Sequence, residues 1–433
     1  MPPRRNLPRP SLDLARFTLD NGLRVVLGPD RSAPAVGIAV HYDVGFRSEP
    51  EGRTGFAHLF EHLMFQGSAN LAKFEADRLI EGNGGLMNGS TRSDYTNYIS
   101  QLPSNALDLG LFLEADRMLS ARLTIENLQN QIDVVKEEIR VNVLNRPYGG
   151  FPWIDLPPVM FRNFNNTHNG YGSFVDLESA TVDDAADFFS RYYAPANAVL
   201  AVTGDFEVDD AVRLVERHFG SLPARTPAEV PDCSEPVPDC ERRGTKVDRL
   251  APVPAIAAGY RVPDPIDELD DYAAAVVLCE ILTDGEASRL FQRLVKQDRV
   301  ATHVGGMLGT FGDPFEVRHP TMLQLMAYHP GTGVDELLGV LDDEVARLAG
   351  GVPQDELDRV VTIMASGYLK RLDNLLQRAM AMATFEQQRG RAEFVNELPA
   401  VLGQVTTGGV VAAADRCLRP ERRAVLIVEA GAA

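Results

Sequence analysis

The sequence has no long apolar run and little positive charge. No stretch of about twenty consecutive apolar residues occurs, so nothing in the chain is expected to span a membrane. The first residues, 1–13, include basic residues and prolines but no apolar segment, which argues against a secretory signal. The formal net charge of −19 excludes nucleic acid as an obvious partner, because binding phosphates requires a basic surface.

Cysteine is also scarce, with four residues scattered along the 433 positions. This excludes a disulfide-rich scaffold and is typical of a reducing compartment, so we expect a cytoplasmic protein. Cys233 and Cys240 are close enough in sequence to form a bridge, but they lack the Cys-X-X-Cys spacing of many metal sites. We expect free or structural thiols rather than a metal site here.

The segment His58-Leu59-Phe60-Glu61-His62 has the HxxEH pattern of inverted zinc hydrolases. Residues four apart on a helix share a face, so His58 and His62 can each direct a ring nitrogen at one ion. The flanking residues are apolar on all sides, as in a buried helix, where ionisable groups need a partner. We therefore expect Zn²⁺ bound by both imidazoles, with Glu61 as the general base. Ordinary core or surface histidines are the alternative.

A catalytic zinc needs a third protein ligand and one open position. Thr124 is expected to cap a helix whose apolar residues recur at helical spacing until Pro147. Two carboxylates on this helix compete for the ligand role. Glu137 points nearly opposite the apolar stripe, whereas Glu138 flanks it beside Gln131. Helical phase favours Glu138 and predicts that Glu137 is solvated.

The glycine-rich segment 82–90 is interpreted as a flexible turn that enters a polar strand. It is not a phosphate-binding loop, because the lysine of that motif is absent. Small residues at Asn88, Gly89 and Ser90 would allow another backbone to approach and pair with the strand. Such a strand binds peptides through main-chain hydrogen bonds. An ordinary hairpin turn is equally consistent with these residues.

Two sequence patterns recur in the second half of the chain. The apolar segment 34–44 reappears at 252–262, and the succession of helix, proline and strand over 181–202 reappears at 407–428. The offsets are 218 and 226 residues. Together with the length of the chain, they predict two homologous α+β domains, each a mainly antiparallel sheet with helices packed on one face.

The predicted boundaries are a catalytic domain at 1–222, a linker at 223–250 and a duplicated, non-catalytic domain at 251–433. The linker is rich in proline, as irregular exposed connections are. An offset of 218 residues sets Val276, Cys279 and Glu280 opposite the three motif residues. The second domain therefore lacks the ligands and is expected to serve as a packing copy.

The chain resembles the pitrilysin-type inverzincin peptidases, in the two-domain branch that includes the subunits of mitochondrial processing peptidase and many bacterial peptidases. The resemblance extends over nearly the whole sequence, from 19–26 through 54–67 and 84–91 to 193–205. It implies that His58, His62 and Glu138 are the zinc ligands, and that Glu61 is the base. Glu138 lies 76 residues beyond His62, a spacing typical of the family. The resemblance also implies that residues 88–90 form the edge strand that holds the substrate.

Two departures from the family pattern affect this expectation. Gln131 replaces a glutamate found in some relatives, where it is expected to support a ligand rather than bind the metal. Active relatives also use an arginine and a tyrosine to grip the substrate, and Val295 and Thr302 occupy the matching positions here. By the same resemblance, the absence of this arginine and tyrosine implies a heterodimer with a homologous subunit that carries both residues. Substitution by Arg299 or His303 is the local alternative.

These inferences predict a zinc-dependent endopeptidase that acts on extended peptides or unfolded segments between two similar subunits. The alternative from another class is a non-catalytic binding or scaffold subunit of a peptidase-like complex. The intact set of three ligands and a base argues against a scaffold, which has no need of them. The sequence does not distinguish removal of a leader from one peptide from general peptide degradation.

Overall fold

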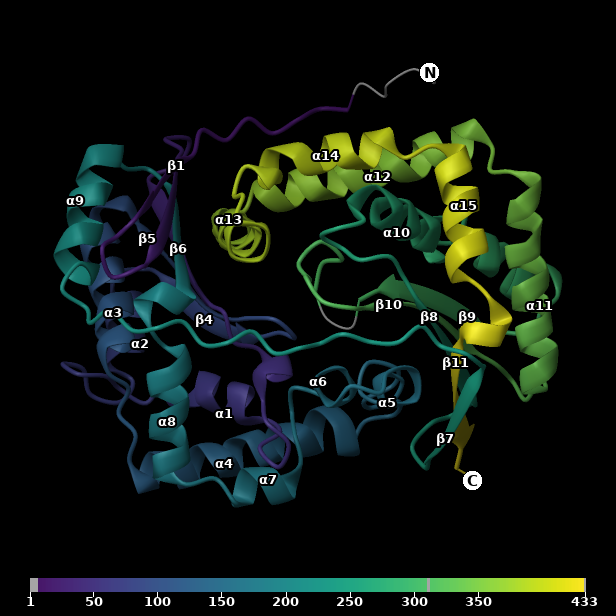
Figure 1. The fold of residues 1–433 in the computed structure, drawn as a ribbon, viewed down its shortest axis with the longest axis horizontal. Helices are drawn as coiled ribbons and strands as arrows, with labels where there is room; N and C mark the ends of the chain where they lie inside the picture. The colour runs from purple at the N-terminus through teal and green to yellow at the C-terminus, as the bar shows by residue number, and fades with distance from the viewer. Residues whose placement is uncertain (1–6, 310–311, 432–433) are drawn as a thin grey trace.

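Two β-sheets, one from each half of the chain, form the framework of the protein (Figure 1). The computed structural model describes residues 7–309 and 312–431. The first sheet has six strands in the order β1 (Ala15–Thr18), β2 (Arg24–Pro29), β6 (Ala198–Gly204), β3 (Ala35–Tyr42), β5 (Thr96–Pro103) and β4 (Leu86–Thr91). The second has five, in the order β7 (Arg242–Asp248), β11 (Ala424–Ala430), β8 (Ala255–Arg261), β10 (Met322–Tyr328) and β9 (His303–Leu308).

Helices from both halves surround the sheets. In the first half they are α1 (Phe56–Leu63), α2 (Glu75–Gly82), α3 (Leu107–Leu119), α4 (Ile125–Ile139), α5 (Pro157–Met160), α6 (Phe164–Thr167), α7 (Phe174–Glu178), α8 (Val182–Tyr192) and α9 (Val208–Phe219). In the second half they are α10 (Leu269–Thr283), α11 (Val334–Arg347), α12 (Gln354–Leu372), α13 (Leu375–Arg389), α14 (Phe394–Gln404) and α15 (Thr407–Cys417). Within the described ranges, no helix is both long and apolar enough to cross a membrane.

The two sheets repeat one strand arrangement, as the sequence patterns predict. In the first, β2 and β6 are parallel, and β3, β5 and β4 follow in antiparallel order. In the second, β7 and β11 are parallel, and β8, β10 and β9 follow in antiparallel order. Both sheets are therefore mainly antiparallel, and the predicted α+β class is confirmed.

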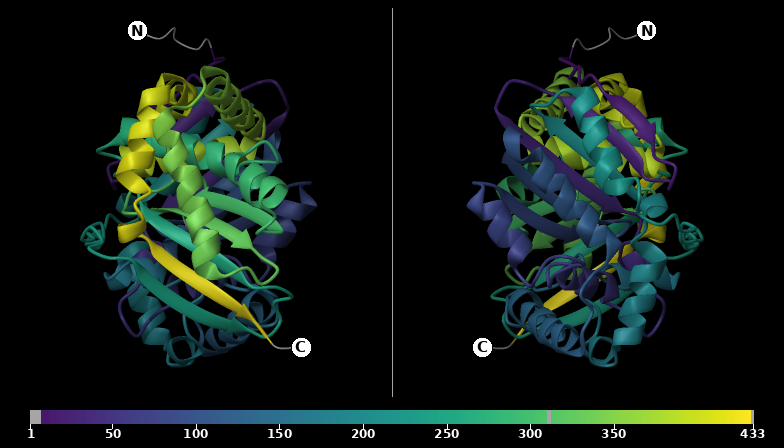
Figure 2. Two further views of the ribbon diagram at one scale, coloured as in Figure 1. Left: turned by 90° about the vertical axis from the view of Figure 1, so that its right-hand side faces the viewer. Right: turned by 90° about the vertical axis from the view of Figure 1, so that its left-hand side faces the viewer.

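Part of the predicted linker belongs to the second sheet. Residues 223–240 have no helix or strand, but Arg242–Asp248 forms β7 and pairs in parallel with β11. Figure 2 shows these two strands side by side near the C-terminus. The physical reason is the duplication: β7 takes the place that β2 has in the first sheet, so the second unit begins before residue 251.

The helices of each half pack on one face of their own sheet, as predicted, and the second face of each sheet is covered by the other half of the chain. In the first half, helices such as α1, α3 and α9 pack on one face of the sheet and form its main core. On the opposite face α13, seen end-on in Figure 1, packs against β3 and β6. The second sheet is covered in the same way by residues of the first half, among them Phe151, Leu156 and Met160. The two units thus share cores and bury the continuous apolar strands on both faces.

Candidate active site

Helix α1 carries the HxxEH motif, and its start is held by a buried carboxylate. Glu49, 1% exposed, accepts hydrogen bonds from the backbone N–H groups of Gly55 (2.9 Å) and Ala57 (2.7 Å). These are among the N–H groups that a helix leaves unpaired at its N-terminus. The apolar residues of α1 are buried in the first core. This leaves His58, Glu61 and His62 to line the side of the helix that faces β4 and α4.

The two imidazoles converge with one carboxylate of α4. Nε2 of His58 lies 3.3 Å from Nε2 of His62, and Oε2 of Glu138 lies 3.6 Å and 3.5 Å from these two atoms. Among the described residues, this is the single group of three or more such side chains close enough to share a metal ion. Donor atoms bound at about 2.0–2.1 Å by a tetrahedral zinc lie about 3.3 Å apart. The donor set and its spacing therefore fit Zn²⁺.

The structure separates the adjacent carboxylates of α4 as helical phase predicts. Thr124 caps the helix by accepting a hydrogen bond from the Asn127 N–H, and α4 then ends at Ile139. Glu138 reaches the imidazoles, whereas the side chain of Glu137 is 65% exposed and pairs with Arg140 at 3.0 Å. Only Glu138 is placed to bind a metal that His58 and His62 bind.

The surroundings set the protonation of the donor set. Burial, together with the nearby charge of His62, lowers the pKa of His58 to about 4, so its ring is neutral at pH 7. The pKa of Glu138 is lowered chiefly by its hydrogen bond with His62, against the opposing effect of burial. Burial also acts to lower the pKa of His62, but the carboxylates of Glu138 and Glu61 outweigh it and raise that pKa. A neutral imidazole and an ionised carboxylate are the forms that bind metals.

Glu61 lies between the helix and the edge strand β4. Its Oε2 accepts a hydrogen bond of 2.6 Å from the Thr91 hydroxyl. A Cβ atom on Gly89 would lie 3.0 Å from Cγ of Glu61, so the strand passes close to the carboxyl group because this residue has no side chain. Burial raises the pKa of Glu61, and the Thr91 hydrogen bond partly offsets that effect. A raised pKa makes the carboxylate a better proton acceptor.

The predicted substrate strand is the outermost strand of the first sheet. β4 pairs with β5 on one side, and the sheet order ends there. Gly89 and Ser90 line the cavity beside the motif, while the side chain of Asn88 accepts a hydrogen bond from the Gly89 N–H. Peptide binding along this strand stays a prediction. Gln131 is buried, and its side-chain amide donates a hydrogen bond of 2.9 Å to Asn130, so its role in supporting a ligand stays a prediction.

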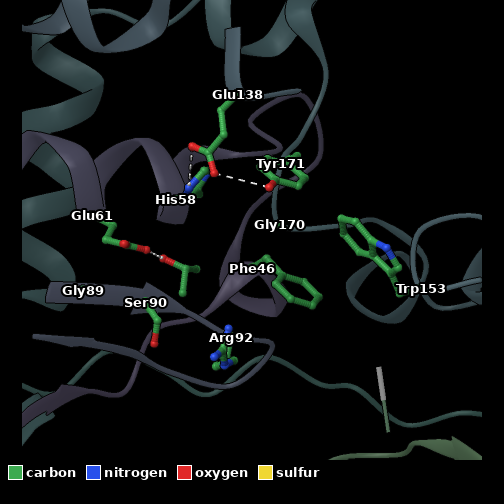
Figure 3. A pocket seen from close by; sticks show the side chains of 11 residues that line it. Phe46, His58, Glu61, Gly89, Ser90, Arg92, Glu138, Trp153, Gly170 and Tyr171 are labelled. Atoms are coloured by element: carbon green, nitrogen blue, oxygen red, sulfur yellow. Dashed lines mark hydrogen bonds and ion pairs between the residues drawn. The ribbon is translucent and has the colours of Figure 1, made fainter. Parts of the chain in front are cut away.

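A cavity of about 200 Å³ opens beside the motif (Figure 3). Sequence reasoning misses several residues of its wall: Phe46, Thr91, Arg92, Trp153, Gly170 and Tyr171. Thr91 ends β4 and Phe46 begins a short 3-10 helix, whereas the other four come from turns and loops without periodicity. The one available signal is Trp153, the single tryptophan of the chain. Neither Arg299 nor His303 is among the lining residues, so the structure gives no support to their local substitution for the absent pair.

Among the residues of the second unit that the structure describes, no counterpart of the donor set occurs. Helix α10 occupies the place of α1 in the repeat, and its Val276 and Cys279 are buried in the second core. Burial raises the pKa of Cys279 to about 12, so this thiol stays protonated. All four cysteines are free thiols, including Cys233 and Cys240. Helix α10 thus packs in the second core, and a non-catalytic role of the second unit stays a prediction.

A second buried pair supports the site and predicts a pH-dependent stability. His168 lies 3.2 Å from Glu49, the carboxylate that holds the start of α1, and its ring nitrogens also contact two backbone carbonyls. Burial acts to lower the pKa of His168, but the hydrogen bond and charge of Glu49 outweigh it and raise that pKa. A histidine whose pKa is raised by folding stabilises the folded state. This stabilisation is fully present at pH values below the pKa in the unfolded chain, about 6.5, and it is lost as the pH rises through the pKa in the folded chain.

We therefore expect His168→Gln to lower the free energy of unfolding by about 3 kcal/mol at pH 6, the scale for removing one partner of a buried pair. The difference from the wild type should shrink at pH 9. Urea unfolding of both proteins at the two pH values measures it. A difference that does not change with pH would show that His168 acts through packing alone.

Comparison with known proteins gives consistent matches along the chain. Residues 24–146 match the family described as Insulinase (Peptidase family M16), and residues 179–364 match the Peptidase M16 inactive domain. The zinc protease PqqE of Helicobacter pylori is 28% identical over 372 residues, which cover 82% of this chain and 80% of the relative. An uncharacterized zinc protease of Mycobacterium leprae, ML0855, is 26% identical, with 96% and 92% covered. The crystal structure of a protease from Helicobacter pylori superposes with a TM-score of 0.89 at 25% identity and covers 96% of this chain and 99% of its own.

Proposed function

Because the chain belongs to the M16 family of peptidases, we propose that it is a zinc-dependent endopeptidase that cleaves extended peptides or unfolded segments. The observation that carries the proposal is the convergence of His58, His62 and Glu138 beside the half-buried Glu61. The names of the relatives support a zinc peptidase, and the chain has three candidate zinc ligands with a candidate general base beside them. A cytoplasmic location stays a prediction.

The residues of the site have distinct roles in this mechanism. His58, His62 and Glu138 would hold the ion. When bound, zinc polarises the scissile carbonyl and lowers the pKa of water toward about 7. Glu61 takes a proton from the attacking water and later gives it to the leaving amine. The Thr91 hydroxyl orients the Glu61 carboxylate, and β4 would hold the peptide backbone through main-chain hydrogen bonds.

We further propose that the active form is a heterodimer with a homologous subunit. Val295 lies in a short helical segment at 291–297, and Thr302 bonds to the backbone of Tyr328. Neither residue lines the cavity, and neither can supply the arginine and tyrosine that the family resemblance implies. A partner would provide this stabilisation of the negative charge that develops on the carbonyl oxygen.

One assay tests both parts of the proposal. The purified chain, alone and mixed with candidate homologous subunits, is incubated with an unstructured peptide. We expect cleavage by the mixture, loss of cleavage with a zinc chelator, recovery with added Zn²⁺, and about 100-fold slower turnover by the lone chain, the scale for one missing oxyanion donor. Full chelator-sensitive cleavage by the lone chain would refute the heterodimer. A folded chain that takes up no zinc and cleaves no peptide under any condition would favour a scaffold subunit.

A further inference from the structure

The two oxygens of the Glu138 carboxylate have different partners. Oε2 faces the imidazoles, 3.6 Å from His58 and 3.5 Å from His62. Oε1 accepts a hydrogen bond of 3.3 Å from the Tyr171 hydroxyl. That hydroxyl itself accepts a hydrogen bond of 3.1 Å from the side-chain amide of Asn142. This division fixes the rotation of the carboxylate and leaves one oxygen directed at the two imidazoles. Figure 3 shows Glu138 joined by dashed lines to His58 and to Tyr171.

Tyr171 also contacts the ring of the first imidazole. The rings of His58 and Tyr171 meet edge to face, with centroids 5.2 Å apart and planes at 80°. On its other side, the Tyr171 ring lies 5.7 Å from the ring of Trp153. One aromatic side chain therefore touches two of the three donors that would bind the metal, although it donates no ligand itself.

The segment that carries Tyr171 is anchored on the start of α1. A Cβ atom on Gly55 would lie 2.5 Å from the carbonyl oxygen of Tyr171, so the two backbones touch. Two residues further, the Ser173 N–H donates to the Thr54 hydroxyl at 3.1 Å, and on the other side His168 pairs with Glu49. The position of Tyr171 is thus tied to the helix that holds both histidines.

Asn142 reaches the tyrosine from a π-helical turn that follows α4. This turn, Arg140–Leu144, comes directly after the helix that carries Glu138. Asn142 lies four residues after Glu138, on the same side of the helix, and its amide lies 3.5 Å from Oε1. Such turns are frequent at functional sites. Tyr171 and Asn142 therefore approach one carboxylate oxygen from separate segments.

We propose that Tyr171 is a positioning residue that sets the metal affinity of this site by holding Glu138 in its ligand orientation, with Asn142 aligning the phenol. The proposal rests on the zinc function proposed above and extends it to residues outside the HxxEH pattern. Without the phenol, Oε1 of Glu138 keeps the longer 3.5 Å contact with the Asn142 amide, so the carboxylate is held less firmly toward the imidazoles. Partners of metal ligands typically change metal affinity by 10- to 100-fold.

The test compares Tyr171→Phe and Asn142→Leu with the wild type and with the control Tyr328→Phe. Tyr328 is a tyrosine of β10 that packs against Tyr148 and Phe151, away from the cavity. Metal-free full-length chains are titrated with Zn²⁺ against a chromogenic chelator, and then with Co²⁺ while the visible absorption of the bound ion is recorded. Melting temperatures of the metal-free proteins show whether each variant is folded.

We expect Tyr171→Phe to weaken Zn²⁺ binding by 10- to 100-fold and to shift the Co²⁺ absorption at saturation. Asn142→Leu should weaken binding by less, because the phenol remains, and Tyr328→Phe should match the wild type. Wild-type affinity and an unchanged Co²⁺ spectrum in a folded Tyr171→Phe protein would overturn the positioning role. If the wild type itself binds neither metal, the zinc function fails first, so the two failures are distinguishable.

Discussion

Glu61→Gln is expected to lower the rate of peptide cleavage by about 100- to 10,000-fold while zinc stays bound. The amide keeps the size of the carboxyl group and can still contact the Thr91 hydroxyl, but it cannot accept a proton from water. The ligand atoms of His58, His62 and Glu138 are untouched, so metal affinity should be nearly unchanged. Turnover of an unstructured peptide and zinc content of the same preparation measure the two quantities.

Glu81→Gln is the matched control, because Glu81 is an exposed glutamate of α2 in the same half of the chain. It should cleave the peptide at the wild-type rate. Retained turnover in Glu61→Gln would refute the assignment of this residue as the base. Loss of zinc from that variant would instead place Glu61 among the ligands.

The second large effect is expected for the neighbouring carboxylates of α4. Glu138→Gln should weaken zinc binding by more than about 100-fold, since loss of a ligand exceeds the effect of losing a ligand's partner. Cleavage should fall with it at limiting zinc. Glu137→Gln removes a charge one position away, where the side chain is 65% exposed and contacts Arg140. It should leave both zinc binding and cleavage unchanged, because exposed ion pairs contribute little.

These two variants form a controlled pair, because they differ only in helical phase. Chelator competition and peptide cleavage are measured on both. Equal zinc affinity in the two variants would contradict the donor set, and a larger effect of Glu137→Gln would reverse the assignment.

The sequence predicts the site where a regular element fixes the direction of each side chain. Four-residue spacing on α1 brings His58 and His62 together, and helical phase on α4 selects Glu138 over Glu137. The strand repeats also predict the two matching sheets. In these parts of the chain, local periodicity determines where a side chain points.

The rest depends on contacts between segments that are distant in sequence. Tyr171 contacts Glu138 from an irregular segment 33 residues later, and no local sequence pattern predicts this contact. Helix α13 lies between the two units although it carries buried polar residues such as Thr384 and Gln387. Its composition therefore does not predict that the helix is buried. Strand β7 has alternating exposure in a segment whose prolines indicate a linker. Tertiary packing overrides local composition in each case.

Zinc content is the most direct test of the central claim that this chain is a metallopeptidase subunit. The purified, folded wild-type protein should contain one zinc ion per chain, removable by a chelator and restored by added Zn²⁺. A folded protein that contains no zinc and takes up none when Zn²⁺ is added would contradict the account and favour a scaffold subunit.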